Sequence, residues 1–116
     1  MGDLTKNFSR SEFACKCGCG YDTVDFETVT ILQEVSDEFG EPVKITSGCR
    51  CFHHNKMVGG KPSSQHLLGR AADIQVKNVD PAAVYEFLNR KYPNKLGLGE
   101  YDTFTHVDTR TGKARW

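Results

Sequence analysis

Residues 64–73 read Ser-Gln-His-Leu-Leu-Gly-Arg-Ala-Ala-Asp, and residues 105–108 near the C-terminus read Thr-His-Val-Asp. These short apolar segments carry titratable groups, whose burial costs free energy unless each group has a partner. A metal ion is such a partner, and we interpret His66, Asp73 and His106 as three ligands of one Zn²⁺. Three protein ligands with a fourth position open to water are typical of catalytic zinc sites, whereas structural sites usually have four protein ligands.

Side-chain alternation along two predicted strands favours this grouping. The first segment ends in a strand that places Asp73 on one face, and the second forms a strand that places His106 and Asp108 together on one face. If the two strands are neighbours, Asp73 and His106 meet, and His66 approaches from the preceding loop. In the alternative interpretation, His66 caps a turn while Asp73 and His106 form an ion pair.

The rest of the chain predicts an α+β fold, with a small antiparallel sheet and helices packed on one side of it. Apolar periodicity and end signals predict the following elements: a short helix within residues 7–13 with a Ser9–Glu12 capping box, helices over 25–39 and 81–91, and strands over 42–47, 71–76, 96–101 and 104–108. Residues 48–64 are expected to form a long functional loop.

Length and composition limit the possible functions. The 116 residues predict one domain, spanning 1–116, which we expect to be a monomer. Lys+Arg and Asp+Glu are both 15, so charge gives no case for nucleic acid as a partner. No apolar run approaches the roughly 18 residues of a membrane span, so we expect no membrane insertion. The first residues lack a signal-peptide hydrophobic region, so we expect synthesis in the cytoplasm without a signal peptide.

The five cysteines fall into two clusters and form an odd set. One interpretation is a structural metal held by thiolates from both clusters, with Cys15, Cys17, Cys49 and Cys51 as candidate ligands. The spacing is C-x-C rather than the usual C-x₂-C. The alternative is reduced cysteines, or one or two disulfides formed after release from the cell.

Five segments carry a further pattern, written here with x for any residue: Phe8-Ser9-x-x-Glu12-Phe13, Thr46-Ser47-Gly48-x-Arg50, Asn55-x-x-Val58-Gly59-Gly60, Ser64-Gln65-His66-x-x-Gly69-x-Ala71-x-Asp73-Ile74 and Phe104-x-His106-Val107-Asp108. Together they resemble the peptidase M15 family, especially its small C-terminal-domain group of phage endolysins and zinc D-Ala-D-Ala carboxypeptidases. The resemblance implies a hedgehog/DD-peptidase-like fold, Zn²⁺ as cofactor and peptidoglycan stem peptides as substrate. It also implies action at the cell wall after release, as in phage lysis, and places His66, Asp73 and His106 at the zinc-ligand positions.

A zinc peptidase also needs a carboxylate that is not a ligand, to move the proton of the attacking water. Well-known relatives carry this acid three residues before the last ligand histidine, where this chain has Thr103. We expect Asp108 to act as the catalytic base because it shares a face with His106. Glu100 is the second candidate, at the spacing of hedgehog-like relatives, and Asp102 the third. In the alternative, Asp108 orients His106 or Arg110.

Substrate contacts are expected from residues that flank the ligands. The resemblance places Arg50 where the family has a substrate-facing arginine, which would clamp a peptide carboxylate or stabilise the tetrahedral intermediate. Ser64 and Gln65 are expected to bond the substrate backbone. Tyr101 and Trp116 could line the cleft, but core packing is expected for both. His53 and His54 could contact substrate, but solvent exposure is expected for both.

Two other functions fit the same pattern. The hedgehog signalling domains show that this fold can retain zinc without peptidase activity, so the chain could be a zinc-binding module that does not cleave. A phage structural or tail-associated protein of the same fold is the other alternative. Fold alone does not distinguish these functions.

Overall fold

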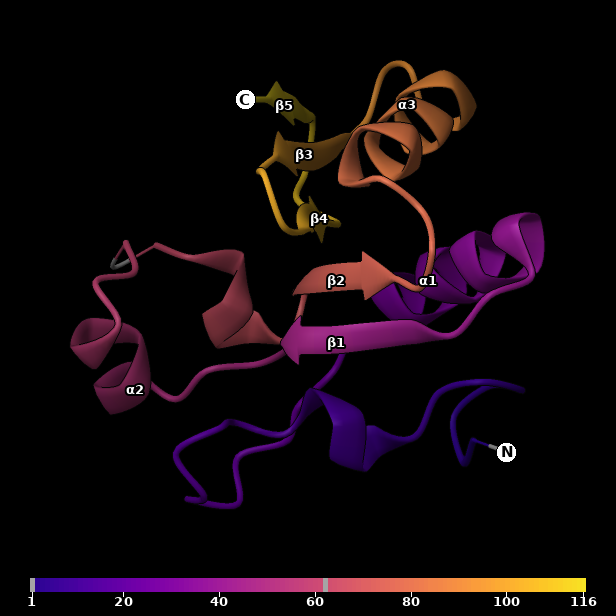
Figure 1. The fold of residues 1–116 in the computed structure, drawn as a ribbon. Coiled ribbons are helices and arrows are strands. Elements are labelled where there is room, and N and C mark those ends of the chain that lie inside the picture. Colours follow the sequence, from indigo (N-terminus) through magenta and orange to yellow (C-terminus); the bar gives the residue numbers. More distant parts are fainter. Residues whose placement is uncertain (1, 62) are drawn as a thin grey trace.

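The structure, a computed structural model, describes residues 2–61 and 63–116. A five-stranded sheet in the order β1-β2-β4-β3-β5 forms its centre (Figure 1). The elements in chain order are η1 (Arg10–Phe13), α1 (Phe26–Phe39), β1 (Val43–Ser47), α2 (Phe52–Met57), η2 (Gln65–Leu68), β2 (Ala71–Val76), α3 (Pro81–Lys91), β3 (Leu96–Glu100), β4 (Thr105–Asp108) and β5 (Lys113–Arg115); η marks a 3₁₀ helix. The α+β prediction is confirmed.

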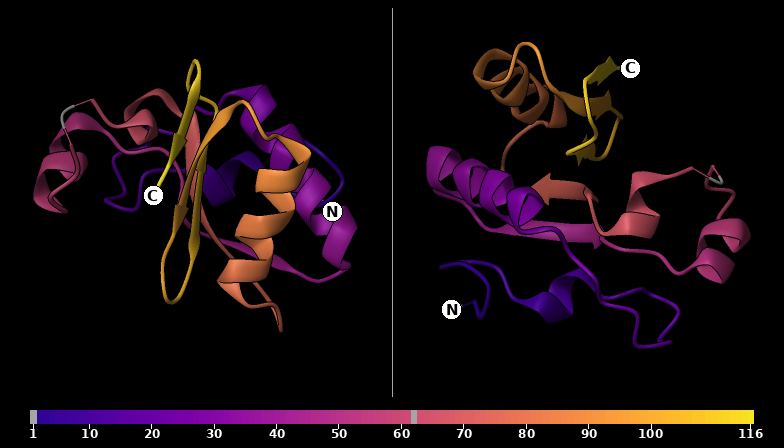
Figure 2. Two further views of the ribbon diagram at one scale, coloured as in Figure 1. Left: turned by 90° about the horizontal axis from the view of Figure 1, so that it is seen from above. Right: turned by 180° about the vertical axis from the view of Figure 1, so that it is seen from behind.

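The two long helices, α1 and α3, cover one face of the sheet (Figure 2). Val29 and Leu32 of α1, Leu88 of α3 and Ile74 of β2 are each at most 1% exposed in the shared core. In the described part of the chain, the opposite face of the sheet carries no such layer of long helices, and there Asp73 of β2 lies beside His106 and Asp108 of β4. One-sided helix packing is therefore confirmed, and it leaves the other face of the sheet available for a site.

The predicted helix ends agree with the structure at the two capping residues Asp80 and Gly40. Asp80 accepts a hydrogen bond from the amide of Ala82 (2.9 Å), with Pro81 in the first turn of α3. Gly40 ends α1 in the left-handed conformation at φ 62°. No helix among the described residues is long and apolar enough to span a membrane.

The sheet departs from the predicted antiparallel arrangement at one edge, so it is mixed. β5 pairs with β3 in parallel, with Leu96 opposite Lys113 and Leu98 opposite Arg115. This three-residue strand is exposed or half-buried and has no alternation that would mark it in the sequence. Its backbone pairing brings the C-terminal Trp116 next to β3, where the Trp116 amide donates to the Leu98 carbonyl over 3.0 Å.

The segment predicted as a long loop contains the helix α2. Six residues are too few to show a clear helical period in the sequence. The buried Asn55 of α2 donates to the carbonyl of Lys61 over 2.8 Å and so folds the rest of the segment back on the helix. Pro62, within this segment, lies outside the described residues.

Candidate metal centre

Three side chains from three elements meet on the open face of the sheet. His66 comes from η2, Asp73 from β2 and His106 from β4, and the pairing of β2 with β4 sets Asp73 directly opposite His106. One potential ligand atom from each residue lies within 4.8 Å of the other two. All three residues are buried, at 3%, 8% and 9% exposure. The structure thus brings together the residues that the sequence suggested as metal ligands.

Backbone and carboxylate partners select the ring nitrogens that face Asp73. Nδ1 of His66 bonds the carbonyl of Gly48, which can only accept, so Nδ1 carries the proton and Nε2 keeps its lone pair. Nε2 of His66 lies 3.5 Å from Oδ2 of Asp73. His106 is held by Asp108 at Nε2 (2.7 Å), while its Nδ1 lies 2.8 Å from Oδ1 of Asp73. Such outer partners are typical of histidines that bind metals.

The electrostatics of the trio favour an ionised Asp73 beside the two imidazoles. Burial opposes the ionisation of Asp73, but its contacts with the imidazoles of His106 and His66 outweigh burial, so the pKa of the Asp73 carboxyl lies well below its ordinary range. Burial lowers the pKa of the His106 imidazole. Its hydrogen bonds with Asp108 and Asp73 outweigh this effect, so the pKa is raised. Two imidazole nitrogens and one ionised carboxylate form a donor set that fits Zn²⁺.

Asp108 is completely buried, and both of its carboxylate oxygens accept hydrogen bonds. Oδ1 accepts from the amide of Gly97 (3.1 Å) and from Nε of Arg110 (2.8 Å). Oδ2 accepts from His106 and from the second arm of the Arg110 guanidinium, both over 2.7 Å. Burial raises the pKa of Asp108, but the bonds from Arg110 and His106 dominate and hold it well below its usual range. Asp108 is therefore a fixed anion that orients His106.

This geometry disagrees with the expectation that Asp108 is the catalytic base. Asp108 bonds Nε2 of His106, and the imidazole ring separates it from Nδ1, the atom that faces Asp73. The second candidate, Glu100, pairs with Thr105, at a position where side chains point to the helix face and away from His106. Asp102 is exposed in the β3–β4 hairpin and does not line the cleft described below. The alternative role of Asp108, orientation of His106, is the one that the geometry supports.

Arg50 lies beside the trio, as expected for a substrate contact. Its guanidinium is 3.6 Å from Oδ2 of Asp73 and donates to Asn55 (3.2 Å) and Ser47 (3.3 Å). Its backbone amide also donates to the carbonyl of His66 over 2.9 Å. These contacts fix Arg50 at the edge of the metal centre, with its side chain still partly exposed.

Ser64 and Gln65 line the same side of the site but differ in role. The Ser64 hydroxyl accepts from the amide of His66 over 3.2 Å and so caps η2. Oε1 of Gln65 is buried and has no hydrogen-bond partner among the described residues. An unpaired buried acceptor is costly, so Gln65 is the better candidate for a bond to a ligand.

A cleft of about 860 Å³ opens over the trio. Three aromatic residues form one wall: Tyr101 stacks on Phe104 with ring centroids 4.4 Å apart, and Trp116 Nε1 donates to the Tyr101 hydroxyl over 2.8 Å. Trp116 also lies 5.1 Å from the ring of His106. The expectation of core packing for Tyr101 and Trp116 is wrong, since they are 42% and 46% exposed. Parallel pairing of β5, which the sequence did not reveal, places Trp116 here.

Comparison with known proteins shows the family of the chain. The family model for peptidase M15 matches residues 6–108. The chain belongs to the peptidase M15 family. No curated protein matched the chain. M15 peptidases are metal-dependent, and the trio in this member is a group that could bind the metal.

Two glycines of this M15 peptidase shape the site, and sequence reasoning missed them. Gly97 and Gly99 of β3 lie opposite Asp108 and His106, on the open face. A Cβ at Gly97 would lie 2.4 Å from both oxygens of Asp108, and one at Gly99 would lie 2.5 Å from Nε1 of Trp116. The Gly-Leu-Gly alternation within a predicted strand could have indicated them, because glycines on one face of a strand allow other groups to lie close to its backbone.

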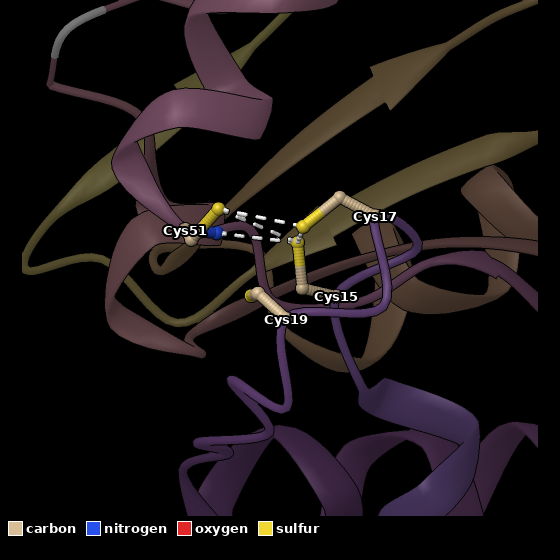
Figure 3. A group of neighbouring side chains, drawn as sticks. All are labelled: Cys15, Cys17, Cys19 and Cys51. Carbon is tan, nitrogen blue, oxygen red and sulfur yellow. Dashed lines mark hydrogen bonds between the residues drawn. The ribbon is translucent and has the colours of Figure 1, made fainter.

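The cysteines form a second group, which differs from the expected one. Cys15, Cys17, Cys19 and Cys51 lie together (Figure 3). Cys49 was a predicted member, but its thiol is buried and donates instead to the carbonyl of Tyr21 over 3.1 Å. Cys49 and Cys51 both follow the end of β1 at Ser47, so strand alternation does not place their side chains on one side.

The remaining histidines lie outside the cleft of this M15 peptidase. His53 and His54 both belong to α2, and neither lines the cleft. His53 is exposed, as predicted, while His54 is half-buried.

Proposed function

We propose that this M15 peptidase is a zinc enzyme that hydrolyses peptide bonds in peptidoglycan stem peptides. The observation that carries the proposal is the selection of ring nitrogens, with Nε2 of His66 and Nδ1 of His106 both turned toward the Asp73 carboxylate. A purely structural ion pair between Asp73 and His106 would not require the Gly48 carbonyl to orient His66. The arrangement supports a metal centre over that simpler alternative.

His66, Asp73 and His106 would hold the ion. When bound, Zn²⁺ would supply Lewis acidity, which polarises a carbonyl group and lowers the pKa of water toward about 7. The remaining residues keep the three ligands in place: Gly48 fixes the tautomer of His66, and Asp108 fixes that of His106. The buried position of the ligands excludes bulk water from all but the cleft side.

Arg50 would recognise the negative charge of the substrate or of the reacting group. Its guanidinium is at the cleft edge, and Arg50 and Asp73 are both among the lining residues. A terminal D-Ala carboxylate bound by Arg50 would favour carboxypeptidase activity. Stabilisation of the oxyanion by Arg50 would serve an endopeptidase equally well. The wall of Tyr101, Phe104 and Trp116 offers apolar surface for the peptide.

One observation favours a second candidate function, a zinc-binding module that does not cleave. Among the described residues that line the cleft, the carboxylates are Asp73 and Asp108. The first is a proposed ligand, and the second is saturated by hydrogen bonds. Neither is free to move a proton, so this cleft could hold a peptide without hydrolysing it.

The experiment that separates the two functions is digestion of purified stem peptides, with the products identified by mass spectrometry. The wild type and His66→Ala are compared, with and without a chelator. Loss of a terminal D-Ala that both treatments abolish would support a carboxypeptidase, and an internal cut would support an endopeptidase. Intact peptides in the presence of a zinc-loaded wild type would contradict peptidase function and favour the binding module.

A further inference from the structure

Four cysteine side chains converge outside the cleft, where the N-terminal loop meets the start of α2 (Figure 3). Cys15, Cys17 and Cys19 come from the loop after η1, and Cys51 immediately precedes α2. We infer that these four residues bind a structural Zn²⁺, separate from the proposed catalytic ion.

The sulfur positions fit one tetrahedral ion. Sγ of Cys15 lies 3.4 Å from that of Cys17 and 3.8 Å from that of Cys51, and the last two are 3.7 Å apart. All four sulfurs lie within 4.8 Å of one another. With Zn–S bonds of about 2.3 Å, the edges of a regular tetrahedron are about 3.8 Å long. A closed set of four thiolates is the donor set of a structural zinc site rather than a catalytic one.

The loop backbone is shaped so that alternate residues point inward. Gly18 and Gly20 both have positive φ, at 82° and 89°, and space for a Cβ is open at each, so conformation rather than crowding calls for glycine. The amide of Gly18 donates to the Cys15 carbonyl over 3.2 Å, and the amide of Cys15 donates to the Tyr21 carbonyl over 2.8 Å. The loop is thereby closed at both ends around its three sulfurs.

Backbone amides are directed at the sulfurs. The amide of Cys51 lies 3.4 Å from Sγ of Cys15, and the amide of His54 lies 3.3 Å from Sγ of Cys51. Such N–H donors stabilise the negative charge that a thiolate ligand carries. The fifth cysteine, Cys49, donates its own thiol hydrogen to Tyr21 and turns away from the group. Of the five cysteines, four would therefore be zinc ligands, and Cys49 would remain a protonated thiol.

The ion would connect the N-terminal loop to the segment that supports the catalytic centre. Gly48, whose carbonyl orients His66, lies three residues before Cys51. The amide of Cys49 donates to the Phe13 carbonyl over 2.8 Å, next to the loop. Arg50, between them, donates from its backbone to His66. Zinc at the cysteines would thus hold this short segment from the side away from the cleft.

Elemental analysis of the purified chain tests the inference. We expect two zinc ions per wild-type chain, one in His66→Ala and one in Cys17→Ser, while the control Cys49→Ser keeps two. X-ray absorption on zinc-loaded His66→Ala, which does not depend on the folding of a cysteine variant, should show four sulfur ligands at about 2.3 Å. This spectrum is independent of peptidase activity, so its result and that of the digestion are distinguishable.

Three results would overturn the inference: zinc bound in His66→Ala mainly through nitrogen or oxygen, iron in place of zinc, or a disulfide among the four cysteines in the natively purified chain.

Discussion

Asp108 holds His106 by Nε2, over 2.7 Å, and this bond leaves the other ring nitrogen facing Asp73. The carboxylate is itself fixed by two hydrogen bonds from the guanidinium of Arg110 and one from the amide of Gly97. A chain of contacts therefore runs from Arg110 through Asp108 to His106. The orientation of one proposed ligand depends on residues that do not reach the metal position.

Asp108→Asn should weaken metal binding without removing a ligand. Asparagine keeps the size of the side chain but loses the charge that favours a proton on Nε2 of His106. Loss of such a partner costs about 10–100-fold in metal affinity, and a competition titration with a chromophoric chelator measures the change.

The matched control is Asp102→Asn, which removes a carboxylate from the exposed β3–β4 hairpin. Its zinc affinity should equal that of the wild type. Equal affinities for all three proteins would show that Asp108 does not position His106.

Gly97→Ala and Gly99→Ala should have different effects although they lie two residues apart on one strand face. The Gly97→Ala methyl would collide with the buried Asp108 carboxylate, so both zinc affinity and stability should fall, the latter by about 1–3 kcal/mol. The Gly99→Ala methyl meets Trp116, which is half-exposed and can move, so zinc affinity should be retained.

Fluorescence of Trp116, the one tryptophan of the chain, reports on Gly99→Ala, and urea denaturation with a chelator titration reports on Gly97→Ala. The reverse pattern, with zinc affinity lost only in Gly99→Ala, would contradict the assigned contacts.

Sequence reasoning found the parts of this site that local patterns encode. Alternation in β2 and β4 correctly placed Asp73 and His106 on one face, because Asp73 and Gln75 alternate with apolar residues in β2, and Val107 separates His106 from Asp108 in β4. Alternation could not predict the function of Asp108, because that function depends on which ring nitrogen of His106 the Asp108 carboxylate contacts. Trp116 was expected in the core and Cys19 was left out of the metal group. Their places depend on contacts between segments distant in the chain: the parallel pairing of β5 and the loop packed beside Cys51.

Arg50→Lys should lower kcat/KM on stem peptides by about 10²–10³-fold, the effect of losing one donor that stabilises a developing oxyanion. Lysine retains the charge but lacks the planar fork that contacts Asn55 and Ser47 while facing the cleft. Steady-state kinetics on a defined stem peptide measures this change. Lys56→Arg, in the exposed part of α2, is the control and should leave activity unchanged. If kcat/KM of Arg50→Lys equals that of the wild type, Arg50 does not recognise the substrate.

The stability of the fold should fall in strong alkali through Tyr92. Its hydroxyl donates to Glu34 of α1. Burial has the largest effect in raising the pKa of Tyr92, and the hydrogen bond to Glu34 raises it further. Because the proton is held more tightly in the folded state, this contribution is complete below the unfolded pKa of about 10 and is lost as pH rises above it.

Urea denaturation between pH 8 and pH 11 should therefore show a shallower decline for Tyr92→Phe than for the wild type, with Tyr85→Phe, also in the α3 region, as the control. Parallel declines for wild type and Tyr92→Phe would contradict the linkage.

The most direct test of the metal centre is a crystal structure of the zinc-loaded protein with anomalous diffraction at the zinc edge. We predict an anomalous peak for a zinc ion bound by Nε2 of His66, a carboxylate oxygen of Asp73 and Nδ1 of His106, with Asp108 still bonded to Nε2 of His106. Absence of zinc between these three residues, or zinc bound to His106 through Nε2 after loss of the Asp108 contact, would contradict it.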